Sequence, residues 1–218
     1  MGERGRFPEA IESFSRALAL DADSVPALLG LGRALFANRQ VTEAKNAFEK
    51  VVGLEPDSPA AYEWLARCLV VGNSPGKAKE VLDRGLKGSP GHPSLHHLYG
   101  QILGQEERYG EAIPHLEMAI AGSAEYPGDV VALDALHYTL AGALLMSGQV
   151  DEGLSHLKRT LSINPRNFMA LNDLGLVHEQ AGQLAEATRY YQQALEVEPS
   201  FTPAAENLKR IQGRNGIS

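Results

Sequence analysis

The chain has 218 residues, of which 44% are hydrophobic, so it can bury a core and is not wholly disordered. Its net charge of −7, without a basic stripe, argues against a nucleic-acid partner. One cysteine allows no internal disulfide, the N-terminus lacks a signal-peptide core, and no stretch reaches the roughly 18 apolar residues of a membrane span, so we expect a cytoplasmic protein without membrane insertion.

The first predicted element is a helix within residues 7–24, where Phe7, Ile11, Phe14 and Leu18 recur at helical spacing. It has the pattern of the second half of a helix pair whose first half does not precede it. Part of its apolar face would then lack cover, whereas a helical array normally ends in a polar face. We expect either a fragment of a longer protein or self-association through the N-terminal helix.

Residues 25–58 form the first complete unit, a pair of antiparallel helices joined by the polar turn Asn38-Arg39-Gln40. Asn38 or Arg39 must adopt the left-handed backbone conformation there, which glycine adopts more easily in later units. Pro56 closes the unit, because proline cannot continue a helix. The apolar faces consist of Leu28, Leu31 and Leu35 in the first helix and Val41, Ala44, Phe48 and Val51 in the second.

The same pattern returns in units 59–92, 93–126, 134–167 and 168–201. Equivalent positions recur every 34 residues, except for one interval of 41. We call each series of equivalent positions a column, and every column has its longer interval, a slip of seven residues, at the same place in the chain. Such a period is the signature of stacked two-helix units. The columns contain small residues (Ala10, Ala44, Ala78, Ala112, Gly153, Ala187), large apolar residues (Phe14, Phe48, Leu82, Leu116, Leu157, Tyr191), the residues three positions later (Ala17, Val51, Gly85, Ala119, Thr160, Ala194) and closing prolines (Pro56, Pro90, Pro165, Pro199).

Seven extra residues, 127–133, cause the slip, and a closing helix at 202–212 has the mixed charge of a solvated cap. The insertion is either a loop or an early start of the next helix near Asp129. The insertion is either a tolerated turn without a role, which we favour, or a functional element, namely a bend in the superhelix or an elbow that binds a partner. We expect the early start, because these apolar residues keep helical spacing: Val130, Leu133, Leu136 and Leu140.

The most complete unit carries Leu171, Leu174, Gly175, Gly182, Ala187, Tyr191, Ala194 and Pro199. At this spacing the chain resembles the tetratricopeptide repeat family. Three positions depart from the family's pattern: Gly153 replaces an alanine, His178 replaces an apolar residue, and Ala124 stands in place of a closing proline. The resemblance implies an all-α fold over residues 1–218. It would be a right-handed superhelical solenoid of antiparallel helix pairs, with about 12 helices, beginning with a half repeat at 7–24.

In this family the first helix of each unit lines a concave groove. Position by position, the resemblance implies a protein-binding groove formed by Leu29, Arg33, Phe36, Trp64, Arg67, Val70, His97, Gln101, Tyr138, Met146, Met169 and Asn172, together with Glu63, Leu145, Asp173 and Leu176. Aromatic, methionine and arginine side chains are favoured at binding hot spots.

Arg33 and Arg67 lie one repeat apart and should be neighbours on the groove wall. They could receive a carboxylate of a bound peptide, or Glu63 could pair with Arg67 on its own helix, and the two interpretations are equally supported. The lysine and asparagine clamp of chaperone-binding members is absent, because other residues stand at the matching positions: Leu29, Arg33, Trp64 and Leu98.

No catalytic constellation or phosphate-binding loop is present, and Cys68 lies in an apolar run that predicts a buried thiol. His96 and His137 occupy equivalent positions, as do His115 and His156, and equivalent positions lie too far apart to share a metal. We therefore expect no metal, no cofactor and no enzymatic activity.

The leading hypothesis is a non-catalytic adaptor that binds a peptide or protein segment in the groove. Two alternatives remain. The chain could be the docking region of a larger enzyme such as a glycosyltransferase, or a self-assembling scaffold.

Overall fold

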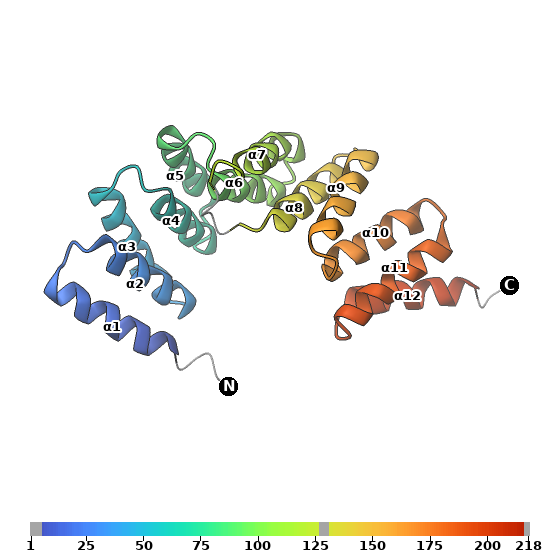
Figure 1. Ribbon diagram of the computed structural model, residues 1–218, viewed down its shortest axis with the longest axis horizontal. Coiled ribbons are helices and arrows are strands. Elements are labelled where there is room, and N and C mark those ends of the chain that lie inside the picture. Colours follow the sequence, from blue (N-terminus) through green and yellow to red (C-terminus); the bar gives the residue numbers. More distant parts are fainter. Residues whose placement is uncertain (1–5, 127–130, 216–218) are drawn as a thin grey trace. The chain divides into compact units, whose positions relative to one another are not determined.

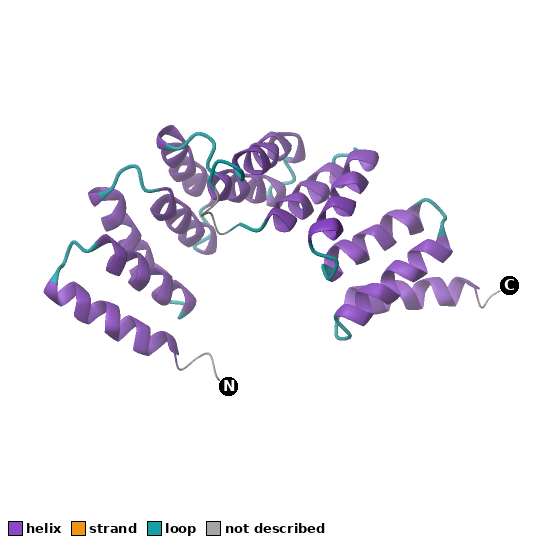
Figure 2. Cartoon of the chain, viewed as in Figure 1, coloured by secondary structure: helices purple, strands orange, loops and turns teal. Residues whose placement is uncertain are grey.

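All the regular structure in the computed structural model is helical; the structure describes residues 6–126 and 131–215 (Figure 1). No strand occurs in these ranges (Figure 2), so the all-α prediction is confirmed. The helices are α1 (Arg6–Leu20), α2 (Val25–Ala37), α3 (Val41–Leu54), α4 (Pro59–Val71), α5 (Pro75–Gly88), α6 (Pro93–Gln105), α7 (Tyr109–Gly122), α8 (Leu133–Met146), α9 (Val150–Ile163), α10 (Phe168–Gln180), α11 (Leu184–Val197) and α12 (Thr202–Asn215).

The helices belong to two compact units. The N-terminal unit comprises residues 1–108 and 121–129, and the C-terminal unit comprises residues 109–120 and 130–218. Within the N-terminal unit each helix from α1 to α6 packs against the next in the chain, and α8 to α12 do the same in the C-terminal unit. Each helix therefore contacts mainly its neighbours in sequence, as expected of stacked repeats.

One residue with a left-handed backbone ends the first helix of each pair. The prediction for the first turn is confirmed, because Arg39 has φ 63°. In that turn the Gln40 N–H donates to the Leu35 carbonyl over 2.9 Å and closes the helix end. The same conformation recurs at the equivalent positions, which are Asn73 (φ 53°), Glu107 (φ 60°), Gly148 (φ 85°) and Gly182 (φ 76°).

The repeated columns form the core. Small residues are needed where the helices cross: at Gly32 an added Cβ would lie 2.6 Å from the Phe48 ring, and at Gly153 it would lie 2.7 Å from Leu145 Cγ. This close approach explains why glycine replaces alanine at position 153. The large apolar column is buried from α3 onward, with exposures of at most 1% at Phe48, Leu82, Leu116, Leu157 and Tyr191.

The expected early start of the helix after the insertion is wrong for the residues described. Helix α8 begins at Leu133, and Ala132 is the extended N-cap residue (φ −65°, ψ 135°). Residues 127–130 of the insertion lie outside the described ranges. The helical spacing that suggested an early start comes from Leu136 and Leu140, which are buried within α8 itself.

Candidate protein-binding surface

The indole ring of Trp64 on α4 is the centre of a cluster of aromatic and arginine side chains in the N-terminal unit. Phe36 meets it edge to face with ring centroids 5.5 Å apart, and Phe48 stacks on it at 5.9 Å. The guanidinium carbons of Arg33 and Arg67 each lie 5.5 Å from the Trp64 ring centroid. The prediction that Arg33 and Arg67 are neighbours is therefore confirmed, because both lie against the same indole ring.

The two arginines of this cluster differ in charge balance. Arg67 donates to Glu63 through Nε (2.9 Å) and forms an ion pair with the same carboxylate at 2.8 Å. The predicted pairing of Glu63 with Arg67 is thus confirmed. Arg33 is exposed and has no carboxylate partner among the described residues. The cluster therefore keeps one uncompensated positive charge at its exposed edge.

A hollow of about 190 Å³ opens beside Phe36 and Arg67, which both contact the Trp64 ring. Leu98 and Ile102 are 5% and 2% exposed, respectively, and Val71 is 60% exposed. The volume suits one apolar side chain of a partner. The lining residues are Phe36, Arg67, Val70, Val71, Leu98, Gln101, Ile102 and Gln105. We call this hollow and the cluster of Arg33, Phe36, Trp64 and Arg67 the Trp64 surface.

The remaining residues predicted for the groove differ in accessibility. Leu29 is partly buried against the core of the N-terminal unit, and His97 is 7% exposed. In the C-terminal unit Tyr138 is half-buried, and Met146 and Met169 are 65% and 40% exposed. Asn172 is only 5% exposed. The predicted residues thus fall into two sets, one in each unit.

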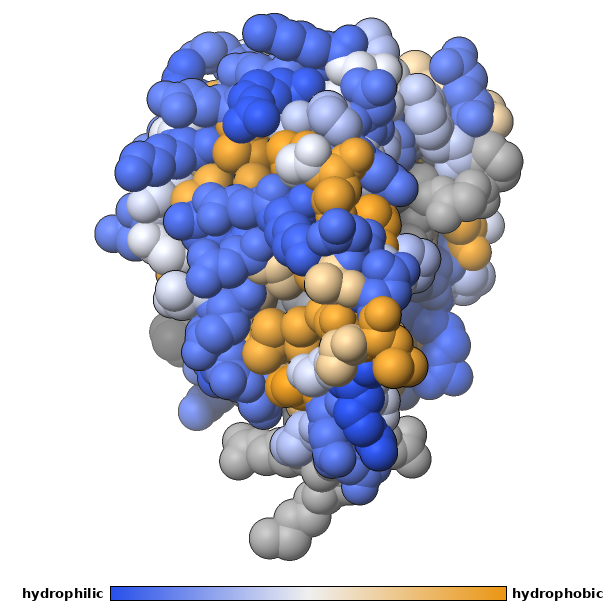
Figure 3. Space-filling view, turned by 90° about the vertical axis from the view of Figure 1, so that its left-hand side faces the viewer, coloured by the Kyte–Doolittle hydropathy of each residue, from blue (hydrophilic) through white to orange (hydrophobic). Residues whose placement is uncertain are grey.

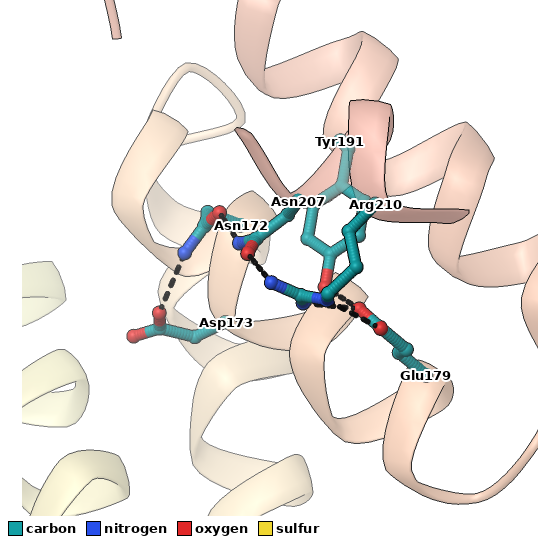
Figure 4. Close-up of polar contacts among 6 residues, drawn as sticks. All are labelled: Asn172, Asp173, Glu179, Tyr191, Asn207 and Arg210. Carbon is teal, nitrogen blue, oxygen red and sulfur yellow. Dashed lines mark hydrogen bonds and ion pairs between the residues drawn. The ribbon is translucent and has the colours of Figure 1, made fainter. Parts of the chain in front are cut away.

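A continuous chain of polar contacts links α8, α10, α11 and α12 of the C-terminal unit, and Figure 4 shows its part on α10, α11 and α12. The sequence pattern does not indicate these contacts, because the mixed charge of α12 predicts only a solvated cap. The chain runs from Tyr138 on α8 through Asp173, Asn172, Asn207, Arg210 and Glu179 to Tyr191 on α11. Asn172 and Asn207 lie 35 residues apart, one more than the repeat length, so they share no column and no sequence signal indicated that these amides meet.

A histidine pair was also missed. The Nδ1 atoms of His137 on α8 and His156 on α9 lie 2.9 Å apart. The two positions belong to different helices of one unit, so the large separation expected between equivalent positions of successive units does not apply to them. Burial lowers the pKa of both imidazoles, and the nearby His156 lowers that of His137 further. No group of three metal-ligating side chains occurs among the described residues.

Cys68 is buried, with 2% of its surface exposed, as its apolar sequence context predicted. Burial raises the pKa of its thiol to about 11, so the side chain stays protonated and is a poor nucleophile at neutral pH. No helix in the described ranges is long and apolar enough to cross a membrane.

A second, larger hollow of about 770 Å³ lies among α3, α4 and α5. Its charged lining is mixed in sign, and Lys45 is already paired with Glu49 at 3.4 Å. None of the residues predicted for the groove lines this hollow. It therefore shows no chemical preference comparable to that of the Trp64 surface.

Curated proteins resemble short stretches of the chain. A protein of Solanum lycopersicum named "Probable UDP-N-acetylglucosamine--peptide N-acetylglucosaminyltransferase SPINDLY" is 42% identical over 48 residues, which are 22% of this chain and 5% of that protein. The TPR repeat-containing protein PA4667 of Pseudomonas aeruginosa is 34% identical over 82 residues, or 38% of this chain and 13% of that protein. The chain thus spans a small part of the length of these relatives.

Solved structures share the fold at low sequence identity. A chain of the APC/C hetero-tetramer Cut9-Hcn1 has a TM-score of 0.79 at 18% identity, covering 95% of this chain and 40% of that one. Yeast Tom70 has a TM-score of 0.74 at 17% identity, covering 93% and 42%. YrrB, described as a TPR protein with an unusual peptide-binding site, has a TM-score of 0.66 at 19% identity, covering 92% and 100%.

Two family models, both described as tetratricopeptide repeat, match the sequence itself. One matches residues 3–48 and 35–102, and the other matches residues 131–199. These ranges cover most of the chain, and the helix pairs, turns and buried columns described above follow the same period. The chain belongs to the tetratricopeptide repeat family, whose fold is typically a non-catalytic module for protein interactions.

Proposed function

We propose that the protein is a non-catalytic adaptor that binds a segment of a partner protein on the Trp64 surface. The observation that carries the proposal is the placement of two guanidinium groups on one partly buried indole ring, beside a hollow lined by apolar and polar side chains. Tryptophan and arginine are the residues most enriched at binding hot spots. The description of YrrB as a peptide-binding protein of the same fold supports this role.

The same geometry indicates the chemistry of the segment. The hollow accepts one apolar side chain, and Arg33 offers an uncompensated cation against the same Trp64 ring as Arg67, which lines the hollow. Because Arg67 is already paired with Glu63, Arg33 is the better partner for an incoming carboxylate. We therefore propose a segment that carries an apolar residue close to an aspartate, a glutamate or a C-terminal carboxylate.

Arg33→Glu tests the proposal, and Arg84→Glu is its matched control. Arg84 also lies over an aromatic ring, 5.6 Å from the Tyr62 centroid, but lines the other hollow. Proteins that co-purify with the wild-type chain are identified by mass spectrometry, and peptides tiling them are titrated by fluorescence anisotropy. We expect one acidic, apolar peptide to bind and to lose at least about tenfold in affinity with Arg33→Glu. Equal losses with both variants would refute the assignment.

A second candidate is a docking region within a larger enzyme. The local similarity to SPINDLY of Solanum lycopersicum favours it, because that protein is named as a glycosyltransferase and the match covers 5% of its length. Sequencing the surrounding gene decides the matter. A catalytic domain in the same reading frame would support this candidate, and an open reading frame of only these residues would exclude it.

A third candidate is self-association through α1. In the large apolar column Phe14 is half-buried, whereas Phe48 at the equivalent position is 0% exposed, and Leu20 at the end of α1 is 92% exposed. Figure 3, which faces the side where α1, α3 and α5 lie, shows separate hydrophobic patches between hydrophilic side chains. Sedimentation analysis should then show dimers that Phe14→Glu dissociates. Wild-type protein that is monomeric at micromolar concentration would exclude this candidate.

We further infer that the adaptor has no catalytic activity, cofactor or nucleic-acid partner and acts in the cytoplasm. The fold class, the protonated Cys68 thiol and the acidic charge support this inference.

A further inference from the structure

The carboxylate of Asp173 on α10 has only neutral partners. Its Oδ2 accepts a hydrogen bond from the Tyr138 hydroxyl over 2.9 Å, and its Oδ1 accepts one from Asn172 Nδ2 over 3.2 Å. No cationic side chain is paired with it among the described residues. Burial raises the pKa of Asp173, and the two hydrogen bonds offset part of that effect. Its negative charge is therefore partly desolvated and not balanced within the unit.

The nearest arginine in the polar chain cannot supply the missing charge. Arg210 donates to the Glu179 carboxylate from Nε over 2.9 Å and from Nη2 over 2.7 Å. Its third nitrogen, Nη1, donates to Asn207 Oδ1 over 2.8 Å. Asn207 in turn donates to Asn172 Oδ1 over 3.0 Å, which leaves the Asn172 amide nitrogen to face Asp173. Figure 4 shows the Asn172 amide pointing at Asp173, and the other hydrogen-bond donor to this carboxylate is the neutral Tyr138 hydroxyl.

The surroundings of Asp173 suit a long cationic side chain. A carboxylate offers about four lone-pair positions, and two are occupied here. Met169, one helical turn earlier on α10, is 40% exposed, and Tyr138 on α8 is half-buried. The aliphatic stem of a lysine or arginine packs well against such side chains while its head reaches a carboxylate. A metal ion fits less well, since no group of three ligating side chains occurs in the described part of the chain.

We propose that Asp173 is a recognition site for a lysine or arginine side chain of a bound protein segment, with Met169 and Tyr138 contacting the aliphatic stem. This site selects the charge opposite to that favoured at the Trp64 surface. It lies in the other unit, so either proposal can fail without the other.

The test is a ¹H–¹⁵N NMR titration of the full chain with three capped pentapeptides. Their sequence is Gly-Ala-X-Ala-Gly, in which X is lysine, arginine or norleucine. We expect the lysine and arginine peptides to shift the side-chain amide signals of Asn172, and the norleucine peptide to bind at least about tenfold more weakly. Norleucine has nearly the same apolar stem without the charge, so equal binding of all three peptides would overturn the proposal.

Three variants separate recognition from bulk charge and from folding. Asp173→Asn should weaken the lysine peptide at least about tenfold, whereas Asp151→Asn, an exposed carboxylate on α9 of the same unit, should change it less than about twofold. Tyr138→Phe should retain binding, because the lost hydroxyl competes with the ligand for the carboxylate. Equal weakening by both aspartate variants, or loss of binding in Tyr138→Phe, would overturn the proposal. Free butylammonium binding as tightly as the lysine peptide would overturn the assignment to a protein segment.

Discussion

Two imidazoles in the C-terminal unit share one hydrogen bond, so protonating both would place two positive charges against each other. The groups that face them are Glu117 on α7, near His156, and Arg159 on α9, near His137. Burial is the main cause that lowers both pKa values below the ordinary 6.5. The unfolded chain therefore binds more protons than the folded chain when the pH falls below that value.

The first prediction concerns the pH dependence of stability. Because the folded histidine pKa values are depressed, the free energy of unfolding should fall as the pH decreases from about 8 to about 5. Urea unfolding at several pH values measures this. The double variant His137→Gln/His156→Gln should lose less stability over the same range. The difference between the two pH profiles gives the contribution of the histidines, because groups such as Asp173 contribute to both proteins alike. Identical pH profiles for the two proteins would contradict the prediction.

At the scale of the helix, the crossing points within pairs decide which glycines can be replaced. At Gly175 on α10 an added Cβ would lie 2.4 Å from the Tyr191 ring, which is fully buried. At Gly142 on α8 an added Cβ meets nothing within 4 Å. The same substitution should therefore have opposite effects at the two positions.

The second prediction follows from this contrast. Gly175→Ala should destabilise the protein by about 1–3 kcal/mol through overpacking. Gly142→Ala should stabilise it by about 0.5–1 kcal/mol, because alanine has the higher helix propensity and no clash arises. Chemical denaturation of both variants checks the signs. Destabilisation of equal size at the two positions would show that packing against Tyr191 is not the cause.

The third prediction concerns how α12 is held on the array. Asn207→Ala removes the donor to Asn172 Oδ1, whose side chain is 5% exposed, and also removes an acceptor of Arg210. An unsatisfied buried amide costs about 1–3 kcal/mol, so α12 should exchange its amide protons faster than the rest of the unit. Glu206→Ala, an exposed neighbour on the same helix, serves as the control. Unchanged exchange in α12 of Asn207→Ala would refute the role of this bond.

Helix pairing and the turn conformation at Arg39 were predictable, because they follow from a period repeated along the chain. The contacts that fill the ends and edges of the array were not. Asn207 and Arg210 lie on a helix that matches the repeat only loosely, so no column pointed to Asn172. The pairing of His137 with His156 depends on how two helices of one unit face each other. The start of α8 at Leu133 depends on the extended backbone of Ala132, which apolar spacing does not encode.

At the scale of the whole chain, the repeats distribute stability locally. The N-terminal unit has its own buried cluster, which includes Leu82, and the C-terminal unit has others, one of which includes Leu157. Both leucines occupy the same column and are 0% exposed. In arrays whose helices contact mainly their sequence neighbours, the stability is approximately a sum of local terms. Damage to one unit should therefore stay mostly within it.

The fourth prediction tests this with a matched pair of cavity variants. Leu82→Ala and Leu157→Ala should each cost about 2–5 kcal/mol, because each removes a fully buried side chain at an equivalent position. Hydrogen exchange followed by mass spectrometry should show faster exchange in α3 to α5 for the first variant and in α8 to α10 for the second. Each variant is the control for the other. If either one accelerated exchange equally from α2 to α11, the chain would unfold as a single cooperative body, and the local account of its stability would be wrong.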